Sequence, residues 1–250
     1  MKIITKKSSP NFDERKSKID IIVIHYTGMQ SFEEALEHLC KPSSKVSSHY
    51  LINSSGDVYL LVDEEKRAWH AGVSYWSGNI DVNSSSIGIE LVNPGHEFGY
   101  EIFSESQMTS LEVLIKSLIN NYNIPLYNIV GHSDIAPLRK KDPGELFNWK
   151  RLAKKNLSIW PKKLSTSFSK NIKIGNKSNG ILQVQEFLSE IGYKITKDGF
   201  FSEETKLVLM AFQRRFRCHK VDGLFDDETG SMIKSIYDLK KQVKKDFEIT

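Results

Sequence analysis

Segments typical of strands alternate with segments typical of helices over residues 15–157, and this alternation constrains the fold more than any other feature of the chain. Each predicted strand is a short apolar run rich in β-branched side chains. The predicted strands are residues 20–26, 49–52, 58–62, 86–92 and 127–132. Elements that alternate in this way are typical of α/β domains, so we expect a mixed central sheet flanked by helices.

Turn and capping signals predict where some of these elements begin and end. Residues 53–57, NSSGD, are typical of a turn and predict a hairpin between the second and third strands. Ser31 is followed by Glu34, and Ser104 by Gln107, which is the spacing of a capping box. We therefore expect amphipathic helices to begin at these two serines.

The composition changes after residue 157, which predicts a second domain. Residues 158–177 are rich in Lys, Ser and Asn and show no sustained period, so they are interpreted as a linker. We expect one domain over 1–157 and a small helical domain over 178–250.

A short repeat supports the helical domain. The sequence DGFFSEET at 198–205 recurs as DGLFDDET at 222–229, and five of the eight positions are identical. Each copy combines a turn with a helix N-cap, Ser202 or Asp226, and acidic residues in the first helical turn. Apolar stripes flank the copies, so three short helices are predicted.

Composition and charge exclude several classes of protein. The formal net charge of +4 is small and the basic residues are scattered, which argues against a nucleic-acid partner but suits an anionic polymer. Lys240, Lys241, Lys244 and Lys245 are interpreted as a solvated helix face. No apolar run approaches the roughly 18 residues of a transmembrane segment, and no signal-peptide pattern is visible. The two cysteines are far apart in sequence, so a disulfide framework is not expected.

Two histidines and one aspartate stand where chemistry is expected in an α/β sheet. His25 and His132 each end a predicted strand, and Asp142 lies in the loop after His132. Functional side chains collect outside strand ends in such sheets. A catalytic zinc takes three protein ligands and keeps one position open for water, and two imidazoles with one carboxylate fit that pattern. Spacing alone is weak support, since there is no HExxH helix.

Five motifs, in this order, make the prediction more specific. They are VIHYTG, SSHYLINSSGDVY, RAWHAGVSYW, SIGIELVN and GHSDIAPLRKKDPG. Together they resemble the N-acetylmuramoyl-L-alanine amidases of the AmpD and AmiD type, over about residues 18–157. Peptidoglycan recognition proteins and phage amidase endolysins share the fold of that family. The C-terminal repeat resembles a peptidoglycan-binding three-helix module.

The resemblance implies an activity, a cofactor and a set of site residues. The activity is hydrolysis of the amide bond between N-acetylmuramic acid, including its anhydro form, and L-alanine in peptidoglycan or muropeptides, for cell-wall turnover or recycling. The cofactor is one zinc ion held by His25, His132 and Asp142. An essential glutamate is implied at Glu90 and an essential lysine at Lys140.

Physical arguments agree with functional roles for Glu90 and Lys140. A carboxylate within the apolar run 87–92 is costly to bury unless it is paired; a salt bridge at the strand edge is the alternative to a catalytic role. Side chains two apart on an extended stretch point the same way, so Lys140 and Asp142 can face one cleft while Lys141 faces away. We expect Glu90 to move a proton from water to the leaving nitrogen and Lys140 to stabilise the oxyanion.

Four other residues have open alternatives. His70 lines the substrate cleft or makes a structural hydrogen bond, and Arg139 meets a substrate carboxylate or solvent. His49 is expected to pack or to bond within its strand. Asp134 orients a ligand histidine or caps the following turn.

Two other functions, and two locations, are compatible with the sequence. A peptidoglycan recognition protein would bind without cutting, and a zinc peptidase would cut within the stem peptide. The wall-binding repeat favours the cell envelope or periplasm, whereas the lack of a visible signal peptide favours the cytoplasm. We expect a monomer. Polymeric and soluble substrates are not distinguished, nor is a need for the 1,6-anhydro sugar or for one stem peptide.

Overall fold

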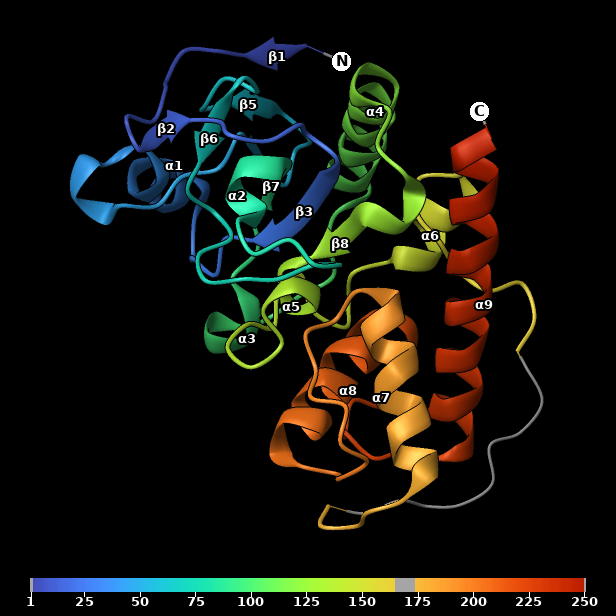
Figure 1. Cartoon of the computed structure of the whole chain (residues 1–250). Coiled ribbons are helices and arrows are strands. Elements are labelled where there is room, and N and C mark those ends of the chain that lie inside the picture. Colours follow the sequence, from blue (N-terminus) through green and yellow to red (C-terminus); the bar gives the residue numbers. More distant parts are fainter. Residues whose placement is uncertain (1, 165–173, 250) are drawn as a thin grey trace. The chain divides into compact units, whose positions relative to one another are not determined.

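The computed structural model describes residues 2–164 and 174–249 and divides into two compact units (Figure 1). The first unit contains the residues up to Ser74 together with Asp81–His132. The second contains Tyr75–Ile80 and the residues from Ser133 onward. The short segment Tyr75–Ile80 therefore interrupts the first unit in sequence.

The first unit is built on a six-stranded sheet with the order β1-β5-β4-β7-β3-β8. Its strands are β1 (Ile3–Ile4), β3 (Ile21–Tyr26), β4 (Tyr50–Ile52), β5 (Val58–Leu60), β7 (Ser86–Leu91) and β8 (Ile129–Gly131). β3 pairs in parallel with β7 and β8, and β4 pairs in parallel with β7. β4 and β5 form the predicted antiparallel hairpin, which makes the sheet mixed. The α/β prediction is confirmed: the apolar run of β3 supplies Ile22, Val23 and Ile24, all with 0% exposure.

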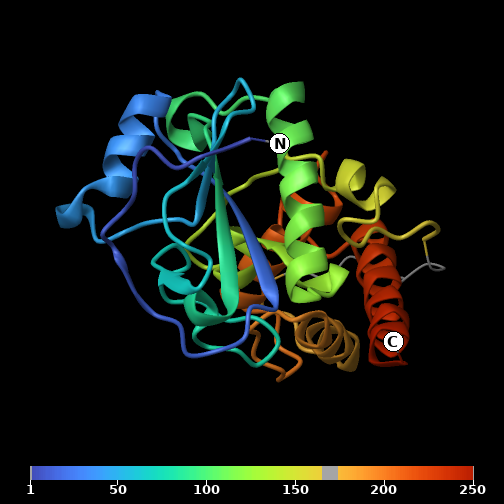
Figure 2. The same cartoon turned by 90° about the horizontal axis from the view of Figure 1, so that it is seen from above.

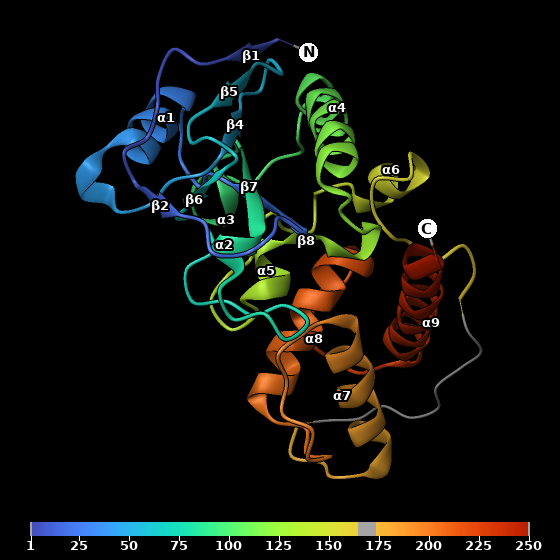
Figure 3. The same cartoon turned by 45° about the horizontal axis from the view of Figure 1, so that its top comes forward.

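Helices cover both faces of this sheet. Helix α1 (Phe32–Cys40) and helix α4 (Glu105–Tyr122) lie on opposite sides of it, as Figures 2 and 3 show. Apolar side chains of α1, such as Leu39, pack against Leu51 and Leu61 on one side. The amphipathic stripes therefore account for the layered arrangement.

Both helices begin at the predicted serines, but the capping boxes are only half formed. The Ser31 and Ser104 hydroxyls accept hydrogen bonds from the amides three residues later. The Glu34 carboxylate instead accepts from the Gln30 amide at 3.1 Å. The buried Gln107 side chain instead donates to the carbonyls of Ile52, in β4, and Val92, just after β7, at 2.9 and 3.1 Å, and so joins the helix to the sheet.

The remaining elements of this unit are short. They are β2 (Phe12–Glu14), β6 (Lys66–Ala68), α2 (Val82–Ser85), α3 (Gly95–Phe98) and the 3-10 helices η1 (Pro42–Ser44) and η2 (Leu126–Asn128). β2 and β6 form a separate antiparallel pair. The sequence did not predict β1 or β2, because these strands are two or three residues long and largely exposed, without an apolar run.

The last predicted strand is shorter than expected. β8 ends at Gly131, and His132 begins the short helix α5 (His132–Ile135). The start of the predicted run belongs to η2 instead of the strand. His132 therefore follows a strand directly, as the functional argument requires, but as the first residue of a helix.

The second unit contains the predicted three-helix group, which consists of α7 (Asn179–Ile191), α8 (Glu203–Phe216) and α9 (Asp227–Ile249). The short helix α6 (Trp149–Lys154) precedes this group in the sequence. The predicted N-caps are present: Ser202 accepts from the Thr205 amide, and Asp226 from the Thr229 amide at 2.9 Å. α9 is longer than the short helix expected, and α7 packs along it through Phe187 and Tyr237, whose ring centroids are 4.4 Å apart.

The sequence repeat corresponds to a repeated hydrogen-bond pattern around two buried glutamines. The Gln185 carbonyl oxygen accepts from the amides of Asp198 and Gly199, and its amino group donates to the Phe200 carbonyl. Gln213 makes the same three contacts with Asp222, Gly223 and Leu224. Each DG turn is thus fixed to the preceding helix by one amide side chain. The repeat comparison did not single out these glutamines, since they lie outside both copies.

The prediction of a solvated lysine face is wrong for Lys240. Lys241, Lys244 and Lys245 are exposed, whereas Lys240 is 8% exposed. Its ammonium group donates to the Ile191 carbonyl at 2.9 Å and to the Ser77 hydroxyl at 3.0 Å. The fourth lysine is therefore a helix-docking residue, because its position on α9 faces α7 and not solvent.

Replacing Lys240 with methionine is expected to change how stability depends on pH. Burial lowers the pKa of Lys240 from 10.5 to about 8; the Lys244 and Arg215 charges add to this effect and Glu190 opposes it. Between these two pH values the folded protein binds fewer protons than the unfolded chain, so the wild-type free energy of unfolding rises with pH relative to the variant. Urea unfolding of both proteins from pH 8 to 10.5 measures this difference. Lys245→Met, at an exposed site, should keep the wild-type profile; parallel profiles for wild type and Lys240→Met would contradict the assignment.

The predicted linker lies partly outside the described residues. Residues 165–173 of the predicted segment 158–177 are not described. Residues 158–164 of that segment belong to the second unit. The boundaries at 157 and 178 stay a prediction.

Candidate metal centre and active site

His25 is carried by β3, a strand whose other residues, apart from Tyr26, are also buried. It lies near the carboxyl end of β3 and is 1% exposed. The strand register places His25 beside Glu90 of β7, and Glu90 beside Leu51 of β4. Paired residues on neighbouring strands project to the same face of a sheet. His25 and Glu90 therefore share one face of the sheet.

His132 and Asp142 are brought together by the loop that joins them. Both side chains are buried, with exposures of 4% and 6%. Ser133, the residue after His132, donates its backbone N–H to the Asp142 carbonyl at 2.8 Å. This bond closes the loop, so that Asp142 returns to the chain next to His132.

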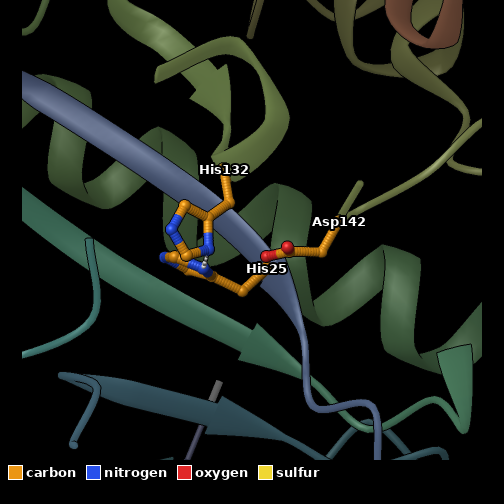
Figure 4. Close-up of side chains that lie close together, drawn as sticks. All are labelled: His25, His132 and Asp142. Carbon is orange, nitrogen blue, oxygen red and sulfur yellow. Dashed lines mark hydrogen bonds between the residues drawn. The ribbon is translucent and has the colours of Figure 1, made fainter. Parts of the chain in front are cut away.

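The three candidate ligands point toward one another, as Figure 4 shows. His25, His132 and Asp142 each offer one ligand atom, and these atoms lie within 4.8 Å of one another. The Nδ1 atoms of the two histidines are 3.0 Å apart. Two imidazole nitrogens and one carboxylate oxygen are a donor set that suits zinc among the biological divalent metals. The cluster can therefore hold a metal ion.

Two further histidines of the first unit, His70 and His49, are also buried. His70 Nδ1 lies 3.0 Å from His25 Nε2, and His70 Nε2 lies 3.2 Å from the Ser86 hydroxyl. Burial, together with the nearby His25, lowers the pKa of His70 well below 6.5. These contacts correspond to the structural alternative for His70; contact with substrate stays a prediction.

His49 bonds to neighbouring elements and not within its own strand. Its Nδ1 accepts from the Gly88 amide at 3.0 Å, and its Nε2 lies 3.0 Å from the Lys66 carbonyl and 2.9 Å from the Arg15 guanidinium. Burial, and then the Arg15 charge, lower the pKa of His49 to about 3. His49 is therefore a neutral side chain that connects three parts of the first unit.

The candidate catalytic residues differ in exposure. Glu90 is half-buried and its Oε2 atom is shielded from solvent. Lys140 is half-buried, Lys141 is exposed and Asp142 is buried, which matches the predicted alternation along this stretch. Arg139 is exposed and can meet either solvent or a ligand.

Comparison with known families agrees with this arrangement. Residues 15–145 match the family described as N-acetylmuramoyl-L-alanine amidase. The chain belongs to the N-acetylmuramoyl-L-alanine amidase family. Residues 177–233 of the amidase match a putative peptidoglycan binding domain.

Individual relatives extend the match over nearly the whole amidase. N-acetylmuramoyl-L-alanine amidase AmiD of Escherichia coli (strain K12) is 34% identical over 251 residues, which cover 93% of this chain and 90% of the relative. The 1,6-anhydro-N-acetylmuramyl-L-alanine amidase AmpD of Haemophilus influenzae is 36% identical over 163 residues, covering 57% of this chain and 86% of AmpD. The solved complex of E. coli AmiD with anhydro-N-acetylmuramic acid-L-Ala-D-gamma-Glu-L-Lys has a TM-score of 0.77, at 31% identity, and covers 93% of this chain and 99% of that chain.

The comparisons confirm several predictions from the sequence. The amidase is a hydrolase of cell-wall turnover, its fold is the mixed α/β fold of its family, and a peptidoglycan-binding domain follows the catalytic part. The ordered motifs gave the correct family because they surround the residues that converge in the structure.

The sequence did not reveal the partners of Asp134. Its carboxylate accepts hydrogen bonds from the Tyr193 hydroxyl at 2.5 Å and from the Arg215 guanidinium at 2.9 Å, all within the second unit of the amidase. The predicted alternatives, a ligand histidine or a turn cap, did not include these partners, because they come from a part of the chain about 60 to 80 residues away. The sequence shows that an acidic residue, a tyrosine and an arginine are present, but it does not show that their side chains meet.

Proposed function

We propose that this amidase depends on one zinc ion, held by His25, His132 and Asp142. The observation that carries the proposal is the convergence of three buried ligand atoms within 4.8 Å. When bound, the zinc ion supplies a Lewis acid that polarises the scissile carbonyl and lowers the pKa of the attacking water toward about 7.

Glu90 and Lys140 then divide the remaining chemistry. Glu90 takes a proton from the attacking water on a carboxylate oxygen and gives it to the nitrogen of the leaving L-alanine. Its register beside His25 supports this role, since it places the carboxylate on the same face of the sheet as that ligand. Lys140 supplies an ammonium group to the oxyanion of the tetrahedral intermediate, which is worth about 3–4 kcal/mol in comparable sites. The exposed Arg139 meets a carboxylate of the stem peptide.

The substrate is a fragment or strand of peptidoglycan that carries the bond between N-acetylmuramic acid and L-alanine. Two similar proteins support the inclusion of the anhydro form: AmiD was solved with anhydro-N-acetylmuramic acid-L-Ala-D-gamma-Glu-L-Lys, and AmpD is a 1,6-anhydro-N-acetylmuramyl-L-alanine amidase. The match to a peptidoglycan binding domain favours polymeric substrate as well. Digestion of intact sacculi in parallel with soluble anhydro-muropeptides compares the two.

We place the amidase in the cell envelope and expect it to act as a monomer. A domain that binds peptidoglycan is useful where the polymer is present, which supports this location. Among residues 2–164 and 174–249, no helix combines the length and the apolar character needed to cross a bilayer.

Exhaustive chelation of the purified amidase is expected to abolish hydrolysis of an anhydro-muropeptide, and one equivalent of zinc should restore it. The reason is that the proposed site relies on the metal to polarise the scissile carbonyl and to lower the pKa of the attacking water. Mass spectrometry of the products measures the release of the intact stem peptide. The Asp142→Ala variant, which lacks one ligand, should not recover with the same zinc.

Two outcomes would contradict the proposal. Full turnover after chelation would exclude the zinc mechanism. Products cut within the stem peptide would instead support the zinc-peptidase alternative.

A further inference from the structure

A chain of hydrogen bonds runs from a backbone carbonyl to the outer nitrogen of His25, all within the first unit. The Ser86 hydroxyl lies 2.5 Å from the Val82 carbonyl oxygen. The Ser86 oxygen also lies 3.2 Å from His70 Nε2. His70 Nδ1 then lies 3.0 Å from His25 Nε2. The other nitrogen of His25, Nδ1, lies 3.0 Å from His132 Nδ1, between two of the three candidate ligands.

The direction of this chain follows from counting protons. A carbonyl oxygen can only accept, so the one hydroxyl proton of Ser86 is donated to Val82. The Ser86 oxygen must then accept from His70, which places the proton of the neutral His70 ring on Nε2. His70 Nδ1 is therefore an acceptor, and the hydrogen bond between the two rings requires a proton on His25 Nε2. His25 Nδ1 keeps its lone pair.

His132 is held in the same tautomer by Ala71, the residue that follows His70 in the sequence. His132 Nε2 lies 3.2 Å from the Ala71 carbonyl oxygen, which can only accept, so the proton is on Nε2 and the lone pair on Nδ1. The two Nδ1 lone pairs then face each other at 3.0 Å. Such an approach is repulsive unless a proton or a cation lies between the two nitrogens.

The acceptors at residues 70 and 71 are fixed by one buried side chain. The Asn83 carbonyl oxygen accepts from the backbone amides of both His70, at 3.1 Å, and Ala71, at 2.7 Å. The His70 ring also occupies space that only a glycine leaves open, because a Cβ on Gly88 would lie 2.4 Å from the ring. The pair is thus held in place by its backbone and by its packing.

We propose that His70 and Ala71 are positioning residues, whose acceptor atoms hold His25 and His132 in the Nε2–H tautomer and so present both Nδ1 lone pairs to the metal. Partners of this kind orient metal-ligating histidines and raise their basicity, and their loss typically costs about 10–100-fold in metal affinity. This inference rests on the proposed zinc site, which it deepens.

The first test is the zinc affinity of His70 and Ser86 variants, measured by competition with a chromophoric chelator. His70→Phe fills the same space without an acceptor and is expected to bind zinc about 10–100-fold more weakly than wild type. His70→Asn places an amide near the position of Nδ1 and should recover most of this loss. Ser86→Ala should weaken binding less than His70→Phe. Ser85→Ala removes a second hydroxyl from the Val82 carbonyl, at 3.4 Å, but leaves the contact between Ser86 and His70 in place, so this variant should bind zinc as wild type does.

The second test uses the wild-type protein and does not depend on whether any variant folds. Long-range ¹H–¹⁵N correlation spectra of the metal-free amidase at alkaline pH report which nitrogen of each ring carries the proton. We expect a proton on Nε2 of His25, His70 and His132, and in the metal-free protein one further proton shared between the facing Nδ1 atoms of His25 and His132. A proton on His70 Nδ1, or wild-type zinc affinity in a folded His70→Phe, would overturn the inference.

These outcomes separate the inference from the proposed function. If the wild type binds zinc and loses activity on chelation while His70→Phe binds zinc equally well, only the positioning role fails. If the wild type binds no zinc, the proposed function fails, and the spectra still decide whether the tautomers are those inferred.

Discussion

Replacing Glu90 with glutamine is expected to lower kcat for muropeptide hydrolysis by about 10²–10⁴-fold while the zinc content stays at the wild-type level. Glutamine keeps the shape and the hydrogen-bonding length of the side chain but cannot take a proton from water. Since Glu90 is beside His25 in the register and is not one of the three clustered ligands, the metal site should survive the change. Steady-state kinetics, with zinc measured by atomic absorption, test both halves of this result.

The control for this prediction is a solvent-exposed glutamate outside the candidate site. Glu37 is exposed on α1, so Glu37→Gln changes the same functional group and the same net charge at the protein surface. Its kcat should equal that of the wild type. A Glu90→Gln protein that hydrolyses muropeptide at the parent rate would show that the proton is moved by another group.

Features that depend on local sequence were predicted well. The strand that carries His25 was visible because four apolar residues in succession require burial on both faces of a sheet. The starts of α1 and α4 were visible because a serine side chain satisfies an amide only three residues away. The metal cluster was predicted from two strand ends and a motif, and the structure brings those three side chains together.

Features that depend on distant partners were not predictable in the same way. In the sequence, Lys240 is one of four similar lysines. Only the packing of α9 shows that it donates to a carbonyl at the end of α7. The sequence allows two alternatives for His70, since the hydroxyl of Ser86 and the ring of His25 become its neighbours only in the folded sheet. A period or a motif identifies which side chains are buried, but it does not say which donor meets which acceptor.

The pair formed by Asp134 and Arg215 is the clearest case of such a distant contact. The two side chains are 1% and 3% exposed, and the carboxylate also accepts from Tyr193. The Arg215 guanidinium lies 4.4 Å from the ring centroid of Trp149. A buried ion pair of this kind does little for net stability, but removing one partner leaves a charge without compensation in a medium of low polarity. Because Asp134 follows Ser133, which is bonded to Asp142, this pair also fixes the loop that carries a candidate ligand.

Replacing Arg215 with methionine is expected to lower the free energy of unfolding by about 3–5 kcal/mol, because it leaves the Asp134 carboxylate buried without its cation. Urea unfolding followed by tryptophan fluorescence measures the loss. Lys234→Met is the matched control: it breaks the partly exposed ion pair with Asp238 and should cost no more than about 1 kcal/mol. In the double variant Asp134→Leu with Arg215→Met, no buried charge remains unpaired, so the combined loss should be smaller than that of Arg215→Met alone. If Arg215→Met proves as stable as the Lys234→Met control, Asp134 must find another partner or become protonated at little cost, and the assigned role of Arg215 is wrong.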